Sequence, residues 1–306
     1  MAVYLVTGGA GFIGSHLVEE LIKKGNHVII VDNLHTGSKE NIKEYIKDIE
    51  FIKKDVKDIV KNDIKGIDGI FHLGIYSSSP MYKENPSFLG NSIDGFLNIQ
   101  KLSQTANVKM IWASTSSVYN GNPTPWSEDM NIYVKDYYTE ARYLMERLSY
   151  LHNEWYETMS IGLRFFSVYG PNEKSKGRYA NLVSQFLWDI QEDRSPIVYG
   201  NGKQSRDLIY VEDVTRGLVK AFNSKVTYGI YNIGTGISYS LNEVIRLITD
   251  ILDKSANPIY LKNPIKGYVK DTLADTSKSK KELGFEAKVE LSKGIKNIIK
   301  KKNQEL

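Results

Sequence analysis

The chain has 306 residues and a net charge of +4, with 41% hydrophobic and 25% charged residues, which is typical of a globular protein of one or two domains. This small charge does not by itself indicate nucleic-acid or membrane binding. Cysteine is absent, which excludes disulfides and thiolate chemistry, and the five histidines lack the spacing of metal ligands. No apolar run is long enough for a signal peptide or a membrane helix, so we expect a cytoplasmic protein without a metal site.

Apolar, β-branched runs alternate with segments of helical periodicity along the first part of the chain. Strands are predicted at residues 3–6, 28–31, 50–53, 69–73, 110–113 and 160–165, and helices at 12–24, 89–106 and 133–156. Strands that alternate with helices form a parallel sheet with helices on both faces. The predicted fold is therefore α/β, with a doubly wound parallel sheet.

The alternation weakens after residue 169, which indicates a second, smaller lobe. A polar loop is predicted at 172–177, a helix at 180–190 and a strand at 197–199. We assign residues 1–166 to the first domain and 167–306 to the lobe, with 206–233 returning to the first domain, so that the two are interwoven.

The C-terminal segment 278–306 is rich in lysine. Leu291, Ile295, Ile298 and Ile299 recur within it at helical spacing, which is typical of an amphipathic helix. We therefore favour a helix with a solvated lysine face over the alternative, a surface that binds nucleic acid.

A glycine-rich loop joins the first predicted strand to the first predicted helix. Gly8, Gly11 and Gly14 allow a sharp turn, a close approach of a pyrophosphate and close packing of the helix on the strand. The start of the helix then directs free N–H groups at the anion. Asp32 ends the next strand, where a carboxylate accepts ribose hydroxyls and repels a 2′-phosphate, and Asn33 rather than an arginine follows it. The pattern predicts an NAD site rather than an NADP site; the alternative is a simple glycine turn.

Further motifs, spread over residues 2–299, resemble those of the extended short-chain dehydrogenases/reductases: VDNLHTG at 31–37, FHL at 71–73 and STSSVY at 114–119. Later motifs resemble the nucleotide-sugar branch of that family and, within it, the UDP-glucose 4-epimerases: LRFFSVYGP at 163–171, RDLIYVED at 206–213 and LADTSK at 273–278. The resemblance implies tightly bound NAD, an N-terminal Rossmann-type domain, a C-terminal lobe that binds a UDP-sugar, and a homodimer.

The resemblance also implies which residues bind these ligands. For NAD they are Gly8, Gly11, Phe12, Ile13, Gly14, Asp32, Asn33, Asp55, Val56, Leu73, Tyr138, Arg142 and Phe165. For the UDP-sugar they are Thr115, Ser167, Asn181, Leu182, Tyr199, Arg206, Lys266 and Thr272. Within this second set Arg206 is implied to pair with the pyrophosphate and Tyr199 to flank the uracil. For Asn181 and Tyr199, ordinary surface exposure or core packing is the alternative.

Tyr138 and Arg142 lie on one face of the predicted helix 133–156, because they are four positions apart. A phenol has a pKa of about 10 in water and is a poor base at neutral pH, but a neighbouring cation favours the phenolate. The similarity to the family's Tyr-x-x-x-Lys pattern implies that Tyr138 is the catalytic base, with Thr115 as its hydroxyl partner. An ordinary exposed helix pair is the alternative.

Several positions depart from the family pattern. Arg142 stands where the family has lysine; it keeps a permanent charge and can donate to ribose hydroxyls, but it cannot relay a proton. Ser167 and Tyr268 stand where the family has asparagine and aspartate, and Ser92 where it has an asparagine on the NAD side. These departures bear on substrate identity and on activity.

The residues that follow Thr115 favour one reaction within the family. Dehydratases and decarboxylases of the family have an acidic residue there, whereas Ser116 and Ser117 are uncharged. We therefore predict NAD-dependent 4-epimerisation of a UDP-hexose, such as the UDP-glucose and UDP-galactose of galactose metabolism. Thr272 is a small residue at the position that resembles the family's gate beside the sugar C2 substituent, which extends the prediction to N-acetyl sugars.

Two alternatives stay open. One is another nucleotide-sugar enzyme of the same fold, a reductase or a decarboxylase. The other is a catalytically impaired protein that only binds a nucleotide-sugar, which the replacement of lysine by Arg142 favours.

Overall fold

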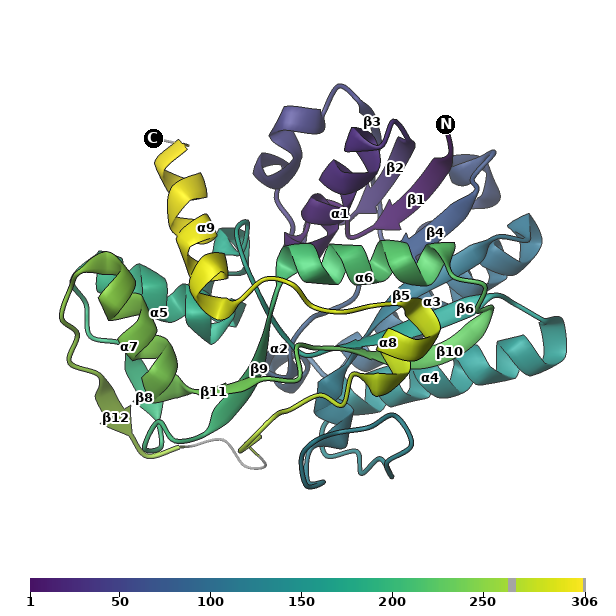
Figure 1. Cartoon of the computed structure of the whole chain (residues 1–306). Coiled ribbons are helices and arrows are strands. Elements are labelled where there is room, and N and C mark those ends of the chain that lie inside the picture. The colour runs from purple at the N-terminus through teal and green to yellow at the C-terminus, as the bar shows by residue number, and fades with distance from the viewer. Residues whose placement is uncertain (264–267, 305–306) are drawn as a thin grey trace.

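The computed structural model describes residues 1–263 and 268–304, with side chains described to Lys301, and its centre is a parallel β-sheet (Figure 1). Its seven strands lie in the order β10 (Tyr228–Ile233), β6 (Ser160–Phe165), β5 (Lys109–Thr115), β4 (Gly69–His72), β1 (Val3–Thr7), β2 (His27–Asp32) and β3 (Ile49–Lys53). Every pair of neighbours in this sheet is parallel. The predicted α/β fold with a doubly wound parallel sheet is confirmed.

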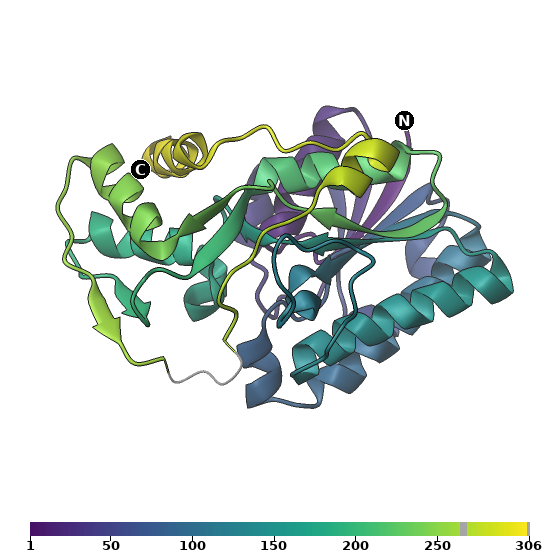
Figure 2. The same cartoon turned by 60° about the horizontal axis from the view of Figure 1, so that its bottom comes forward.

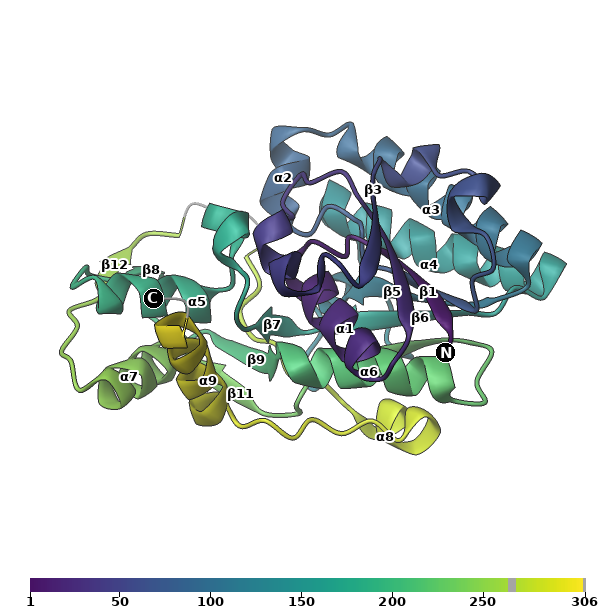
Figure 3. The ribbon, with the colours of Figure 1, turned by 90° about the horizontal axis from the view of Figure 1, so that it is seen from above.

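Helices cover both faces of this sheet (Figure 3). One face carries α1 (Phe12–Lys23) and α6 (Val211–Asn223), and the other carries α3 (Phe88–Ala106) and α4 (Tyr137–Tyr156). Successive side chains of a strand point to opposite faces. Leu5 accordingly packs in the core with residues of α3 and α4, whereas Val6 packs in the core with residues of α1 and α6. Burial on both faces explains why the strands are continuous apolar runs.

The smaller lobe lies to the left in Figure 1. It contains a three-stranded sheet in the order β11 (Ser238–Ser240), β9 (Ser205–Tyr210) and β7 (Ser167–Tyr169), and a pair of parallel strands, β8 (Ile197–Tyr199) and β12 (Ile259–Leu261). Its helices are α5 (Leu182–Gln191), α7 (Leu241–Leu252) and α9 (Leu291–Gln304). The apolar faces of these three helices share one core.

The chain passes between the two parts several times (Figure 2). After β9 it returns to the large sheet as α6 and β10, and it then re-enters the lobe at β11. The short helix α2 (Ser79–Glu84) follows β4, and α8 (Ser277–Leu283) packs against β10. Short 3-10 helices complete the fold: η1 (Lys39–Tyr45), η2 (Val56–Asp58), η3 (Lys61–Ile64), η4 (Ser116–Tyr119) and η5 (Lys174–Tyr179).

Two helices begin later than the sequence pattern predicts, because a polar side chain caps each of them. Helix α4 begins at Tyr137 rather than at 133, and the Asp136 carboxylate accepts a hydrogen bond from the Thr139 N–H at 2.8 Å. Helix α5 begins at Leu182 rather than at 180, and the Asn181 side chain accepts from the Val183 N–H at 3.0 Å. Each cap fixes the entry of its helix beside the same cavity.

Two further segments contain helical structure beyond the sequence-based prediction. The polar loop predicted at 172–177 contains most of the 3-10 helix η5. The amphipathic helix predicted within the lysine-rich segment 278–306 is α9, and a second, shorter helix, α8, precedes it and ends where Gly284 adopts a φ of 63°. The apolar face predicted for the end of the chain is confirmed, because Leu291, Ile295 and Ile298 are buried in the lobe core.

A buried ion pair joins α4 to the sheet. The Arg164 guanidinium on β6 donates to both oxygens of the Glu146 carboxylate, with Nε to Oε1 at 2.9 Å and Nη2 to Oε2 at 2.6 Å. The Ser114 hydroxyl on β5 donates to the same carboxylate at 2.6 Å. Both charged side chains are only 4% exposed, so α4 is held at one register on the sheet.

Candidate active site

A cavity of about 1120 Å³ opens where the large sheet meets the smaller lobe. Its walls come from the loops that follow β1, β2, β4, β5 and β6, from the start of α4 and from the lobe. Ligands of doubly wound sheets bind at the carboxyl ends of the strands, and the cavity has this position. Every residue predicted to bind NAD lines it: Gly8, Gly11, Phe12, Ile13, Gly14, Asp32, Asn33, Asp55, Val56, Leu73, Tyr138, Arg142 and Phe165.

The glycine-rich loop packs so closely that side chains are excluded at two of its glycines. A Cβ atom at Gly8, where φ is +69°, would lie 2.6 Å from the backbone nitrogen of Gly74. A Cβ atom at Gly14 would lie 2.1 Å from the carbonyl oxygen of Gly8. No side chain caps the start of α1, so this loop presents bare backbone to the cavity, which fits the pyrophosphate of NAD.

Asp32 lies at the end of β2 on the wall of the cavity. Its carboxylate accepts from the Leu34 N–H at 2.7 Å and from the Ala10 N–H at 3.0 Å. Burial raises the pKa of this carboxyl, and the two backbone hydrogen bonds oppose that shift. Each oxygen keeps a lone pair for a ribose hydroxyl, so the group fits the adenosine ribose of NAD.

His72, at the end of β4, is a cavity residue whose role was not predicted. Its Nδ1 lies 2.7 Å from the Thr7 hydroxyl, which also accepts from the Gly74 N–H at 3.1 Å. Burial, and secondarily the charge of Arg142, lowers the pKa of His72 to about 3, so the ring is neutral. The pair fixes the loop after β1 against the loop after β4, where Gly8 and Gly74 meet. His72 belongs to the FHL motif at 71–73, but the motif alone does not show that its ring contacts Thr7.

The predicted catalytic residues line one cavity. The Arg142 guanidinium carbon lies 5.2 Å from the centroid of the Tyr138 ring, and Nη2 of Arg142 donates to the Tyr76 carbonyl oxygen at 2.7 Å. Arg142 is only 3% exposed, so its charge is weakly screened. Thr115 ends β5, and its hydroxyl accepts from the Ser117 N–H at 3.2 Å.

An aromatic cluster backs the Tyr138 side chain, and no motif predicted it. The Tyr82 and Tyr138 ring centroids are 5.7 Å apart, and Tyr76 stacks on Phe88 at 3.7 Å. The Tyr82 hydroxyl lies 2.7 Å from the hydroxyl of Ser92, the residue that replaces a family asparagine. Burial raises the pKa of Tyr82, which keeps its hydroxyl protonated and able to hold Ser92.

Arg206 on β9 lines the cavity, and several of its N–H groups donate to backbone carbonyl oxygens. Nη1 donates to the Ser205 carbonyl at 2.7 Å and to the Lys270 carbonyl at 2.9 Å, and Nη2 donates to the Val269 carbonyl at 2.7 Å. The Tyr268 ring lies over the guanidinium, with its centroid 5.1 Å from the guanidinium carbon. Arg206 therefore holds the segment 268–270 as one wall of the cavity.

Two polar residues predicted to touch the substrate also have structural partners. The Asn181 side chain caps α5 and donates to the Val168 carbonyl oxygen at 2.9 Å. Thr272 is 6% exposed, and its hydroxyl accepts from the Asp207 N–H at 2.9 Å. Both still line the cavity, as do Thr115, Ser167 and Arg206.

The remaining predicted substrate residues lie elsewhere. Leu182 lines an adjoining hollow of about 380 Å³, which shares Ser167, Asn181 and Arg206 with the main cavity. Tyr199 is 39% exposed and lines neither space. Lys266 lies outside the described residues.

Known proteins resemble the chain over its length. The model of the NAD dependent epimerase/dehydratase family matches residues 4–234. A putative UDP-glucose 4-epimerase of Methanocaldococcus jannaschii is 34% identical over 302 residues, 96% of each chain. A UDP-glucuronate 4-epimerase of Thermodesulfobacterium geofontis is 33% identical, over 100% of this chain and 98% of that one. The structure of UDP-N-acetylglucosamine 4-epimerase from Methanobrevibacter ruminantium M1 has a TM-score of 0.94 and 31% identity, over 100% of this chain and 99% of that one.

The close approach at Gly14 generates a test of the cofactor site. Gly14→Ala places a methyl group 2.1 Å from the Gly8 carbonyl, and relieving this overlap costs on the order of 1–3 kcal/mol. We expect NAD affinity to fall at least about tenfold, measured by isothermal titration calorimetry with protein freed of nucleotide. Gly90→Ala, in α3 with no atom within 4 Å of the new Cβ, is the control and should bind NAD normally. Equal affinities for both variants would contradict the assignment of the glycine-rich loop with Gly8, Gly11 and Gly14, called the glycine cradle below, to the NAD pyrophosphate.

Proposed function

The chain belongs to the NAD-dependent epimerase/dehydratase family, and we propose that it converts a UDP-hexose into its 4-epimer. The observation that carries the proposal is one cavity in which the glycine cradle, Tyr138, Thr115 and Arg142 all lie. NAD is the cofactor of this family; when bound, it supplies the oxidation of the sugar at C4 and the reduction that reverses it.

In this proposal the protein's own residues remove one proton from the sugar and later return it. Tyr138 takes the proton from O4 of the sugar and later returns it. The Arg142 guanidinium lies over the Tyr138 ring and is the cation placed to stabilise negative charge that develops in this step. The Thr115 hydroxyl accepts from a backbone N–H and keeps its own hydrogen to donate to the phenolate or to O4. In this proposal Tyr138 is the general base, and Thr115 and Arg142 stabilise the charge that the proton transfer creates.

Several neutral hydroxyl groups line the cavity near Thr115. Ser116 and Ser117 follow Thr115, and Ser167 lines the same cavity. The absence of an acid directly after Thr115 supports epimerisation over the dehydratase and decarboxylase alternatives. The names of the similar proteins cover UDP-glucose, UDP-glucuronate and UDP-N-acetylglucosamine, so all three are candidate substrates.

The cellular setting is part of the same proposal. We expect a cytoplasmic homodimer; exposed aromatic side chains on α4 support the dimer, with Tyr137, Tyr150, Trp155 and Tyr156 between 44% and 69% exposed. Among the described residues, no helix combines the length and the apolar composition needed to cross a membrane.

The epimerase proposal is tested by following three UDP-sugars with the NAD-loaded protein in an NMR time course: UDP-glucose, UDP-N-acetylglucosamine and UDP-glucuronate. We expect the 4-epimer of at least one to appear. Tyr138→Phe should lower the rate by about 10²–10⁴-fold, the usual contribution of a general base, without weakening UDP binding. Tyr137→Phe, which changes the exposed neighbour, is the matched control and should stay active. A decarboxylated product would favour the decarboxylase alternative. NAD-loaded protein that changes none of the three sugars would favour the alternative of a catalytically impaired protein that only binds a nucleotide-sugar.

A second prediction concerns the cation beside Tyr138. Arg142→Lys should keep or raise turnover, because it preserves the charge and restores the family residue. Arg142→Ala should lower turnover by about tenfold or more, since it removes a charge-assisted contact beside the phenolate. Steady-state rates with the best substrate measure both effects. An alanine variant as active as the wild type would show that the cation has no part in the reaction.

A third prediction concerns the width of the sugar site at Thr272. Thr272→Tyr fills the space that an acetamide group would need, so it should depress turnover of UDP-N-acetylglucosamine more than turnover of UDP-glucose. Thr272→Val keeps the size and removes the hydroxyl that accepts from the Asp207 N–H; it controls for the loss of that contact and should keep the wild-type preference. An equal loss on both sugars in the tyrosine variant would remove Thr272 from this role.

A further inference from the structure

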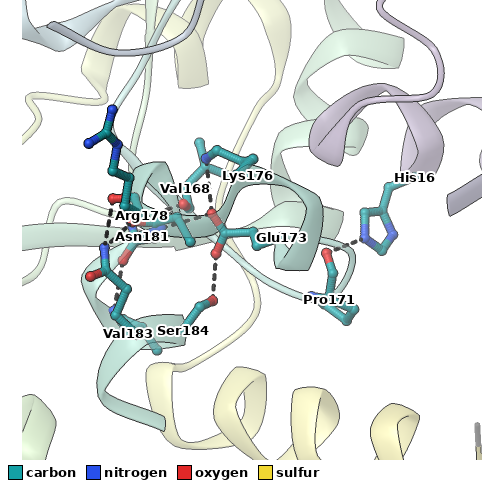
Figure 4. Close-up of polar contacts among 11 residues, drawn as sticks. His16, Val168, Pro171, Glu173, Lys176, Arg178, Asn181, Val183 and Ser184 are labelled. Carbon is teal, nitrogen blue, oxygen red and sulfur yellow. Dashed lines mark hydrogen bonds and ion pairs between the residues drawn. The ribbon is translucent and has the colours of Figure 1, made fainter. Parts of the chain in front are cut away.

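The segment 170–179 connects the smaller lobe to the start of the cofactor helix α1. His16 Nε2 lies 3.1 Å from the Pro171 carbonyl oxygen (Figure 4), and Asn172 donates to the Ser15 hydroxyl at 3.0 Å. Both contacts lie on the first turns of α1, directly after the glycine cradle. The segment is therefore seated against the helix whose N-terminal end forms the NAD site.

Glu173 anchors this segment with a carboxylate that is completely buried. One oxygen accepts from the Lys176 ammonium at 3.0 Å and from the Asn181 N–H at 2.9 Å, and the other accepts from the Ser184 hydroxyl at 2.5 Å (Figure 4). A buried carboxylate is stable only when it is paired and hydrogen-bonded. The Glu173 carboxylate therefore determines where the Lys176 ammonium is held.

The Lys176 side chain contacts Glu173 and lies near the first residue of α1. Its ammonium nitrogen is 5.2 Å from the ring centroid of Phe12, the first residue of α1, and its side chain lines the cavity. An ammonium has three donors, and Glu173 is the one hydrogen-bond acceptor that Lys176 has among the described residues. Two donors are thus left for a ligand in the cavity.

Lys83, Lys135 and two arginines also line the cavity, and the two arginines are directed elsewhere. Arg142 lies over Tyr138, and Arg206 lies against Tyr268 and the carbonyl oxygens of 269 and 270. Backbone N–H groups and a helix terminus offer a pyrophosphate only partial positive charges. Among the lysines and arginines that line the described part of the cavity, Lys176 is the one whose ammonium lies over the ring of Phe12, the residue that directly follows Gly11.

We propose that Lys176 donates to the pyrophosphate of bound NAD, and that Glu173 is a positioning residue that holds Lys176 there. The smaller lobe then contributes directly to cofactor retention, and the cofactor in turn holds the segment 170–179 in place. A reaction that regenerates its cofactor benefits from this arrangement, because NAD need not leave between turnovers.

The test measures NAD binding and requires no turnover, so its outcome is independent of the epimerase assay. Lys176→Met keeps most of the side chain and removes the charge, and Lys174→Met changes an exposed lysine of the same segment as a control. NAD affinity is measured by calorimetry with nucleotide-free protein at low and high salt, and UDP affinity is measured in parallel. We expect Lys176→Met to weaken NAD binding about tenfold, the order of one charge-assisted hydrogen bond, and to reduce its salt dependence. The control should match the wild type, and UDP affinity should be unchanged in both.

A second set of variants separates the cofactor contact from a general loss of structure. Glu173→Gln combined with Lys176→Met leaves no unpaired buried charge, so this double variant should fold and still bind NAD weakly. Lys176→Arg should restore most of the affinity. Wild-type NAD affinity in the single or the double variant would overturn the proposal. A loss of UDP affinity with normal NAD affinity would also overturn it, because Lys176 would then belong to the substrate.

Discussion

The position of helix α4 is the constraint on which the candidate active site depends, and one buried ion pair sets it. Glu146 lies four and eight positions after Arg142 and Tyr138, so the three side chains share one face of the helix. The Glu146 carboxylate is held by Arg164 on β6 and by Ser114 on β5. A buried pair with complete hydrogen bonding tolerates little displacement, since either charge alone would be strongly destabilising. Ser114 directly precedes Thr115, and the same contact therefore fixes both Tyr138, the base of the proposed reaction, and Thr115, its proposed hydroxyl partner.

This network continues beyond the ion pair into the wall of the cavity. Arg164 also donates to the Tyr119 hydroxyl at 2.6 Å, and that hydroxyl donates to Asn232 on β10 at 2.8 Å. Asn232 donates in turn to the carbonyl oxygens of Trp126 and Asp275. The segment that contains Thr272 is thus tied through polar contacts to β6 and β10 of the large sheet. The chain needs its repeated crossings between the two parts to make these contacts, because β10 and the segment near Asp275 come late in the sequence.

Local sequence patterns were sufficient to predict the parallel sheet and the glycine-rich loop, because interactions between residues close in sequence determine them. Apolar runs on strands such as β2 predicted the parallel sheet, and the spacing of Gly8, Gly11 and Gly14 predicted a loop that packs against backbone. The capping residues Asp136 and Asn181 were also visible locally, and applying the preference of such residues for helix starts would have corrected both boundaries. Glu173, His72 and Tyr82 were not predictable in this way. Their importance arises from burial against residues of other elements, and a sequence pattern without an alignment carries no information on such contacts.

Arg206 shows how the recognition of the nucleotide and of the sugar can be coupled. Its guanidinium already donates to the carbonyl oxygens of 269 and 270, and its face is covered by Tyr268. Guanidinium has five donors in a rigid plane, so a diphosphate bound to the remaining ones would share the group with this segment. Thr272 follows two residues later, and its hydroxyl accepts from the N–H of Asp207, the residue after Arg206 on β9. Under the proposed function, the strand that holds the diphosphate therefore also positions the residue beside the sugar. The tyrosine that replaces the family aspartate at 268 takes part in this coupling by covering the guanidinium rather than by pairing with it.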